Sequence, residues 1–301
     1  MTAGRQRVRA YLQLVRLPAV FTAMADIVLG FVLAHSTLSP ASEFIALLGA
    51  STGLYLAGMA FNDFFDRAVD AQERPNRPIP SGRISPRSAL ALAVALAVVG
   101  LACASAAGGR AIGIAAALTA LILAYDGFLK KTLAGPVAMG GCRMLNVLLG
   151  ASGAELSLGE SPQIAVAAAM GIYVAGITWF ARQEAGKSSR AQLMAATLVI
   201  HGGIAALVAI VFAGWPMLEG DRRIVLVALA IVSAFVDVRL APAIRNPTPD
   251  KVQAAVKRLL LAIVLFDAAL IYWKTGNPAL ACGTALLVLP AAALGRWIFI
   301  T

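Results

Sequence analysis

The stretch AFNDFFDRAVDAQERPNRPIPSGRIS, residues 60–85, sets four acidic side chains and four arginines between two long apolar segments. The whole chain has 301 residues, of which 60% are hydrophobic and only 13% are charged. A soluble domain normally carries about 25% charged residues. Charge is therefore scarce in this protein, and its concentration beside two apolar segments needs a functional explanation.

Long apolar runs predict that the chain crosses a membrane many times. A spanning helix needs roughly 20 mostly apolar residues. Ten runs fit this description: 17–35, 43–64, 88–108, 110–126, 135–152, 163–182, 191–213, 223–240, 256–273 and 278–299. They lack the alternation expected of a transmembrane barrel. The sequence predicts an all-α polytopic membrane protein, one domain over 1–301, with nine or ten spanning helices, of which 110–126 and 223–240 are the weakest.

The distribution of positive charge predicts the orientation of the chain. The net charge is +10, which could suggest a nucleic-acid partner, but most of the cations lie in alternate connections. These are the N-terminal arm and the loops 65–87, 127–133, 182–190 and 239–258. Such a bias is typical of cytoplasmic loops. We therefore expect an inner-membrane, multi-pass protein with both termini and these loops cytoplasmic, surrounded by lipid and without nucleic acid as a partner.

The acidic residues after the second apolar run have the spacing of a metal site. Asn62, Asp66 and Asp70 are four apart and would share one helix face, and Asp63 would meet Asp66. Grouped carboxylates repel one another unless a cation lies between them. Oxygen ligands suit hard cations, above all Mg²⁺ when phosphate oxygens complete its octahedron. The motif therefore predicts Mg²⁺ bound together with a phosphorylated ligand.

The arginines that follow support the same ligand. Arg74, Arg77 and Arg83 lie in a proline-rich loop, and arginine forks bind phosphate oxygens bidentately. Acids and then arginines at the end of an apolar bundle suit a diphosphate head with a long hydrocarbon tail in the membrane. The alternative is that these charges only anchor the protein at the membrane surface.

The string NDxxDxxxD, followed by RPNRPIPSGRIS, resembles the first signature of the UbiA superfamily of intramembrane prenyltransferases. The resemblance runs from VRLP (15–18) through at least the sixth predicted helix. It implies a UbiA-type bundle of nine or ten transmembrane helices around a central cavity. It also implies that Asn62, Asp63, Asp66 and Asp70 bind Mg²⁺ and the diphosphate of a prenyl donor.

Other residues acquire expected roles through the same resemblance. Arg77 and Ser81 belong to the signature and would touch phosphate or hold the loop. The segment YDGFLKK (125–131) resembles the family's tyrosine-plus-lysine segment, so Lys130 and Lys131 would reach the diphosphate. The alternative for this lysine pair is simple anchoring of the topology.

Several polar residues lie inside the predicted spans. Arg143 and Asn146 are three apart in GGCRMLNVLLG (140–150) and would share a helix face. Because an intramembrane arginine is expensive, it suggests function or a specific partner. We expect the pair at the cavity, or else in structural contact with another helix. The other such residues are Asp26, Asp126, His201, Asp237 and Asp267.

The sequence departs from the family pattern at the end of the sixth predicted helix. The family usually has two aspartates there for a second Mg²⁺, whereas ITWFARQEAGKSSR (177–190) has only Glu184. This form resembles the divergent EboC-like branch of the family. One interpretation is an enzyme with one full metal site, in which Glu184 and nearby cations hold the diphosphate. The other is a protein that binds or transports an isoprenoid-linked compound without catalysis.

The expected reaction is Mg²⁺-dependent transfer of a prenyl group from an isoprenyl diphosphate to a small acceptor. A benzoate, a quinone precursor, a tetrapyrrole tail and a cyclitol or sugar all remain open as acceptors, and so does the length of the donor. A proton relay through Asp26, Asp237 and Asp267 is a third hypothesis, but it leaves the 62–83 motif unexplained.

Overall fold

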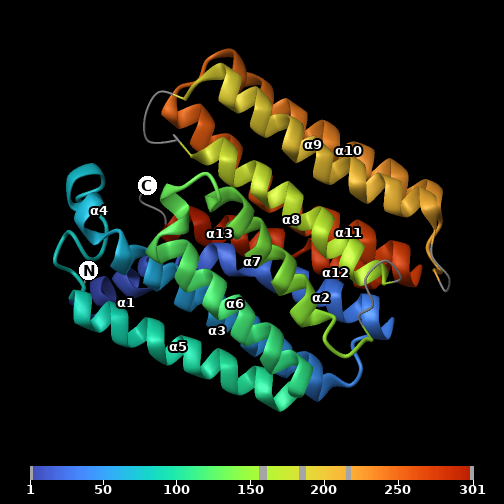
Figure 1. Ribbon diagram of the computed structural model, residues 1–301, viewed down its shortest axis with the longest axis horizontal. Coiled ribbons are helices and arrows are strands. Elements are labelled where there is room, and N and C mark those ends of the chain that lie inside the picture. Colours follow the sequence, from blue (N-terminus) through green and yellow to red (C-terminus); the bar gives the residue numbers. More distant parts are fainter. Residues whose placement is uncertain (1–2, 156–160, 183–187, 215–217, 299–301) are drawn as a thin grey trace.

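The computed structural model describes residues 3–155, 161–182, 188–214 and 218–298. Helices and their connections account for all of these residues, with no strand among them (Figure 1). The helices are α1 (Ala3–Leu14), η1 (Leu17–Ala19), α2 (Val20–His35), α3 (Ala41–Phe65), α4 (Arg67–Glu73), α5 (Pro86–Ala107), α6 (Gly109–Gly127), η2 (Leu129–Lys131), α7 (Gly135–Gly150), α8 (Pro162–Ala181), α9 (Arg190–Ala213), α10 (Arg222–Arg245), α11 (Pro249–Thr275), α12 (Pro278–Ala285) and α13 (Val288–Ile298).

Nine of the ten predicted spans each contain one long helix, and 278–299 contains the two shorter helices α12 and α13. The predicted all-helical fold class is confirmed. Eight helical segments are long and apolar enough to cross a membrane. The two predicted spans outside that group are α7 and α11. The first has only 16 residues, about 24 Å of helix, which is shorter than the roughly 30 Å hydrocarbon core. The second carries Lys257, Arg258 and Asp267 within its apolar run.

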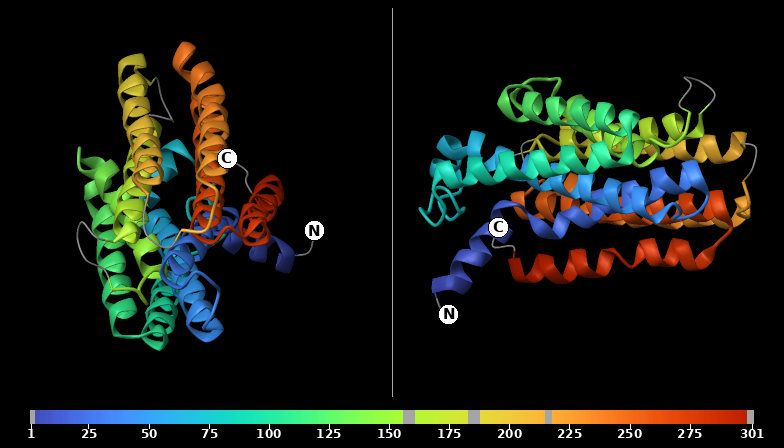
Figure 2. Two further views of the ribbon diagram at one scale, coloured as in Figure 1. Left: turned by 90° about the vertical axis from the view of Figure 1, so that its right-hand side faces the viewer. Right: turned by 90° about the horizontal axis from the view of Figure 1, so that it is seen from below.

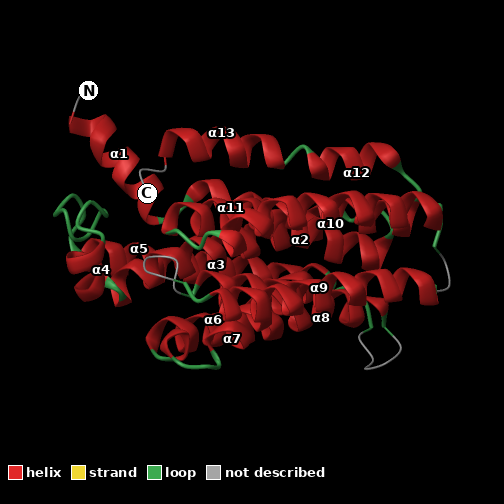
Figure 3. Ribbon diagram, turned by 90° about the horizontal axis from the view of Figure 1, so that it is seen from above, coloured by secondary structure: helices red, strands yellow, loops and turns green. Residues whose placement is uncertain are grey.

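The helices run nearly parallel or antiparallel in one bundle, and the connections lie at its two ends (Figure 2). The helices α1 and α4 and the end of α13 lie at the same end of the bundle. Helices α12 and α13 form an outer layer beside α2 and α11, opposite α6 and α7 (Figure 3). The acidic motif therefore lies where the first and last helices meet.

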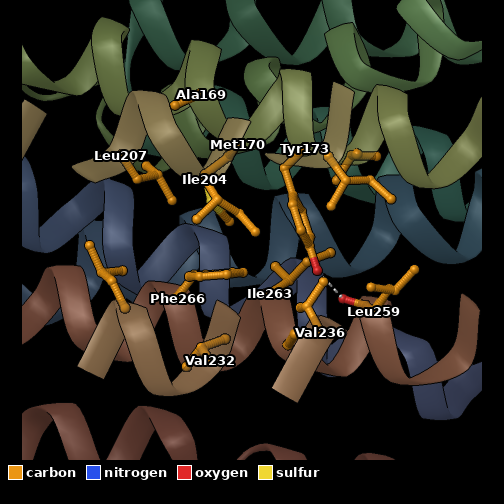
Figure 4. Packing of buried hydrophobic residues seen from close by; sticks show 14 of the residues in the cluster. Ala169, Met170, Tyr173, Ile204, Leu207, Val232, Val236, Leu259, Ile263 and Phe266 are labelled. Atoms are coloured by element: carbon orange, nitrogen blue, oxygen red, sulfur yellow. Dashed lines mark hydrogen bonds between the residues drawn. The ribbon is translucent and has the colours of Figure 1, made fainter. Parts of the chain in front are cut away.

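The largest apolar core joins α8, α9, α10 and α11 (Figure 4). The ring of Tyr173 meets that of Phe266 edge-on, with centroids 5.2 Å apart. Its hydroxyl donates a hydrogen bond of 3.0 Å to the carbonyl oxygen of Leu259, which satisfies a polar group that would be costly to bury alone. These contacts hold α11 firmly against α8 along one side of the bundle.

Helices α2 and α7 cross where both have glycine. A Cβ atom on Gly30 would overlap the carbonyl oxygen of Val147, and one on Gly150 would lie 2.7 Å from the carbonyl oxygen of Ile27. Small residues allow helix backbones in membranes to approach this closely. Because of this approach, the polar side chains one turn before each glycine can reach across from one helix to the other.

We predict that Gly30→Ala destabilises the protein by about 1–3 kcal/mol, since the new methyl group meets backbone atoms that cannot rotate away. The matched control is Gly113→Ala on α6, where an added Cβ has no atom within 4 Å. That change should be neutral or stabilise by up to about 1 kcal/mol, because alanine favours helix. Thermal unfolding in detergent compares the two, and equal transition temperatures would contradict the close approach of α2 and α7.

Candidate active site

A cavity of about 490 Å³ lies between α2, α3, α6, α7, α8 and α11. This volume is within the usual range for small-molecule sites. Its walls carry two groups of polar side chains, and apolar residues such as Met59, Ile122 and Ile177 lie between them. The outer charged cluster comprises Arg16, Asn62, Asp63, Arg77 and Asp126. The inner polar cluster comprises Thr22, Ser51, Arg143 and Asn146 at the wall, together with Asp26 directly behind it.

Arg16 lies at the centre of the outer charged cluster. It precedes Leu17-Pro18 in a left-handed conformation, with φ of 46°, which costs a non-glycine residue roughly 1–2 kcal/mol. Its Nη2 atom donates to Oδ1 of Asn62 (3.3 Å) and of Asp63 (3.2 Å). Burial alone would lower the pKa of Arg16, but its interactions with Asp63, Tyr55 and Asp70 together outweigh burial, and the pKa is raised above its ordinary value. The strained backbone thus aims a permanent positive charge at the acidic motif.

Arg77 joins two acids of the motif that come from different helices. Its Nη1 atom lies 3.2 Å from Oδ1 of Asp63 on α3 and 2.6 Å from Oδ2 of Asp70 on α4. Both carboxylates are buried, with 4% and 3% of their surface exposed. The proline-rich loop therefore folds back on the motif, and Arg77 lines the cavity beside Asp63.

Asp126 joins α6 to the same site. Its Oδ1 atom accepts a hydrogen bond of 2.8 Å from Asn62 and lies 3.7 Å from Nζ of Lys130. Lys130 is closer to Asp66, at 2.7 Å. Asp66 stands between α3 and α4 and, unlike Asn62 and Asp63, does not line the cavity. The acidic motif is therefore divided between residues at the cavity and residues that pair with cations beside it.

Asp66, Asp70 and Lys130 pair beside the cavity without lining it, and three further predicted site residues lie apart from it or outside the described chain. The Ser81 hydroxyl donates to the carbonyl oxygen of Arg77 at 2.6 Å, a contact that supports the loop. Lys131 is exposed and does not line the cavity. Glu184 lies outside the described residues.

The inner polar cluster surrounds the guanidinium of Arg143. Arg143 donates to the Asp26 carboxylate and to the carbonyl oxygen of Thr22 at 3.1 Å. Asn146 donates to Oδ2 of Asp26 at 2.8 Å and accepts from the hydroxyl of Ser51 at 2.7 Å. Arg143 lines the cavity, whereas Asp26 is fully buried behind it. Arg143 therefore meets both expectations, because it faces the cavity and also forms an ion pair with a residue of another helix.

A second carboxyl group stands behind this ion pair. Asp267 of α11 is fully buried and interacts with Asp26 and Arg143. Asp237 instead pairs with His201 at 2.8 Å, and both side chains are exposed. The three aspartates of the relay hypothesis therefore do not form one cluster.

The two clusters lie about 15 Å apart along the bundle. On α3, Ser51 precedes Asn62 by eleven positions, and on α2 and the turn before it Arg16 precedes Asp26 by ten. A helix rises about 1.5 Å per residue. The same cavity therefore offers charge near the end of the bundle that carries α4 and hydrogen-bonding groups deeper within it.

The outer charged cluster offers oxygen ligands for Mg²⁺ but not a complete set of them. Asn62, Asp63 and Asp66 offer the oxygen ligands that Mg²⁺ prefers. Each of the two acids already faces a cation, and the described residues contain no group of three acidic, His or Cys side chains arranged around a metal. Mg²⁺ commonly binds through one or two carboxylates plus substrate phosphates. These residues fit an ion that enters with a diphosphate, and they do not form a complete cage by themselves.

The cavity-lining residues that sequence reasoning missed include Arg16, Tyr55 and Lys257. Arg16 lies in VRLP (15–18), and an arginine directly before Leu-Pro at a helix start is the sequence signal that points to it. Tyr55 lies one turn beyond Ser51 on the same face of α3. Lys257 reaches the cavity from α11, and nothing in its local sequence distinguishes it from the neighbouring Arg258.

We predict that Arg143→Met destabilises the protein by about 3–5 kcal/mol, because Asp26 then lacks its buried counter-charge. Adding Asp26→Leu to this variant should recover most of the loss, since an apolar pair needs no partner. Thermal unfolding of the wild type, both single variants and the double variant measures the coupling. Additive losses would show that the ion pair does not act as a unit.

Comparison with known proteins agrees with the geometry. Residues 23–261 match the UbiA prenyltransferase family. A digeranylgeranylglyceryl phosphate synthase of Methanopyrus kandleri is 38% identical over 124 residues, which cover 41% of this chain and 45% of that protein. One from Methanothrix thermoacetophila is 52% identical over 68 residues, or 23% of this chain and 24% of that protein. The matches thus span less than half the length of these curated relatives.

Solved structures share the fold at low sequence identity. A digeranylgeranylglyceryl phosphate synthase has a TM-score of 0.65 at 18% identity, covering 90% of this chain and 100% of that one. A UbiA homologue of Archaeoglobus fulgidus bound to DMAPP and Mg²⁺ has a TM-score of 0.63 at 17% identity, covering 91% and 98%. Together with the match over 23–261, which is more than three-quarters of the sequence, these findings establish that the chain belongs to the UbiA prenyltransferase family.

Proposed function

We propose that this protein transfers a prenyl group from an isoprenyl diphosphate to a small acceptor within the membrane, with Mg²⁺ as cofactor. The observation that carries the proposal is one cavity with arginines and carboxylates at one end and apolar walls beyond them. A diphosphate head with a hydrocarbon tail matches that order. UbiA homologues of Archaeoglobus fulgidus bound to DMAPP or GPP with Mg²⁺ support it.

Donor binding begins with an exchange of partners in the outer charged cluster. Arg16 and Arg77 share Asp63 in the free protein, and a diphosphate would accept hydrogen bonds from both guanidinium groups. Asn62, Asp63 and Asp66 would then hold Mg²⁺ against the phosphate oxygens, with Asp70 and Lys130 beside them. Bound there, Mg²⁺ supplies Lewis-acid neutralisation of the leaving diphosphate.

Residues of the cavity then stabilise the leaving group, exclude water and receive the proton that the acceptor loses. The bond between the prenyl carbon and diphosphate oxygen breaks, and the electron pair leaves with diphosphate, which Arg16 and Arg77 stabilise. The apolar walls exclude water from the allylic cation. The acceptor forms the new bond and loses a proton, and Asp126 beside Tyr125 is the cavity carboxylate available to receive it.

The finer assignments are part of the same proposal. The acceptor binds between the two clusters, within reach of Asp126, and Arg143 and Asn146 lie beyond it in the cavity. An aromatic acceptor is one of those left open. The segment WFARQEAGKSSR supports placement in the EboC-like branch. The positive-inside bias supports an outer charged cluster that faces the cytoplasm.

We predict that purified protein binds farnesyl or geranylgeranyl thiodiphosphate, a slowly reacting donor analogue, more tightly with Mg²⁺ than without it. In Asp63→Asn the gain from Mg²⁺ should disappear, a loss of about 10–100-fold at saturating Mg²⁺, because a metal ligand has been removed. Calorimetry or a fluorescence competition assay in detergent measures both affinities.

The matched control is Glu73→Gln, which removes one exposed negative charge from α4 without touching the cavity. It should keep the wild-type response to Mg²⁺. If the wild type binds neither analogue, the donor site does not exist. If it binds, but membranes supplied with radiolabelled geranylgeranyl diphosphate and a total lipid extract yield no prenylated product, the non-catalytic binding hypothesis is favoured.

A further inference from the structure

The side of the cavity opposite the acidic motif is formed by α8 and α11. The α8 residues that line it are Val174, Ile177, Thr178 and Ala181, and segment 161–182 contains no acidic residue. The α11 residues that line it are Gln253, Val256, Lys257 and Leu260. Within the described part of the chain, this side therefore presents an amide and an ammonium group where a second metal site would need carboxylates.

Lys257 lies level with the outer charged cluster. It precedes Asp267 by ten positions on α11, just as Arg16 precedes Asp26 by ten. Helices α11 and α2 pack side by side, and Asp267 is close enough to Asp26 for the two carboxyl groups to interact. The same helical rise of about 1.5 Å per residue therefore brings Lys257 and Arg16 to similar heights. Gln253 is one turn from Lys257 on the same face, so both side chains border the charged end of the cavity.

The charge balance at this end favours a polyanion. Among the described residues that line the cavity there, the cations are Arg16, Arg74, Arg77 and Lys257 and the carboxylates are Asp63 and Asp126. Asp70 pairs with Arg77 just behind this wall. A terminal phosphate carries about −1.5 to −2 near pH 7, and the inner phosphate adds another negative charge. The complex of a diphosphate with one Mg²⁺ is therefore still negative and complements this wall, whereas a second Mg²⁺ would make it positive.

We propose that Lys257, with Gln253 one turn away, forms a second phosphate-binding wall that takes the place of a second metal site. The inference rests on the prenyl-donor function proposed above. The ammonium of Lys257 donates hydrogen bonds to diphosphate oxygens from α11, whereas Arg77 donates from the loop that follows α4. The diphosphate is thereby held between a wall of acids and arginines and a wall with lysine and glutamine.

The simpler alternative is that Lys257 is a cation that anchors α11 at the membrane surface. Its neighbour Arg258 is a natural comparison, because it is also exposed and cationic but does not line the cavity. An anchoring role would make the two residues equivalent. A phosphate-binding role predicts that only Lys257 contributes to donor binding, because successive residues on a helix point about 100° apart.

The test measures binding of geranylgeranyl thiodiphosphate to wild type, Lys257→Ala, Lys257→Arg and Arg258→Ala, each at zero and saturating Mg²⁺. We expect Lys257→Ala to weaken binding at least about tenfold in both conditions, as expected for loss of a charge-assisted hydrogen bond. Lys257→Arg should retain most of the affinity. Arg258→Ala should stay within about twofold of wild type, as for a charge at an exposed site.

Each outcome bears on one claim. Wild type that fails to bind the analogue defeats the proposed function itself. Wild type that binds while Lys257→Ala binds equally well defeats this inference alone, as does an equal loss in Lys257→Ala and Arg258→Ala. A thermal unfolding midpoint unchanged between Lys257→Ala and Arg258→Ala excludes misfolding as the cause of a selective loss.

Discussion

Burying an arginine inside a bilayer is the constraint on which the deeper part of this structure depends. Arg143 on α7 is stable there because Asp26 on α2 opposes it, and Asn146 and Thr22 supply further hydrogen bonds. That contact requires the two helices to approach closely, which Gly30 and Gly150 permit. The short helix α7 is thereby tied to α2 by polar contacts as well as by packing, and the inner end of the cavity becomes polar.

In the outer charged cluster, too, each buried charge needs a counter-charge, but here the ion pairs can exchange partners with a ligand. Its acids are also neutralised by basic side chains, but these come from a strained turn, a proline-rich loop and a short 3-10 helix. Arg16 and Arg77 can exchange Asp63 for a phosphate group without leaving any charge unpaired, provided that a metal ion takes over the carboxylate. An inner ion pair supports the fold, and the outer pairs are suited to exchange with a ligand.

The two sides of the cavity differ in chemistry. Helices α3 and α6 contribute carboxylates together with the arginines that face them, whereas α8 contributes uncharged residues and α11 contributes Lys257. The packing of Tyr173 against Phe266 and Leu259 holds α11 beside α8 and keeps Lys257 at the cavity. A diphosphate between these walls would be neutralised partly by protein cations, which lessens the need for a second acidic motif.

Local features of the sequence were sufficient to predict the spans and the region of the site. Hydropathy over about 20 residues reports a membrane helix without knowledge of its neighbours, and the acidic motif with its arginines is contiguous in 60–85. The sequence also indicated that Arg143 needs a partner. Only the tertiary structure decided which groups meet: Arg16 reaches Asp63, Arg143 reaches Asp26, and Lys257 reaches the cavity. These partners lie on different helices, and their contacts depend on how closely and at what height the helices pack, which no single helical segment encodes.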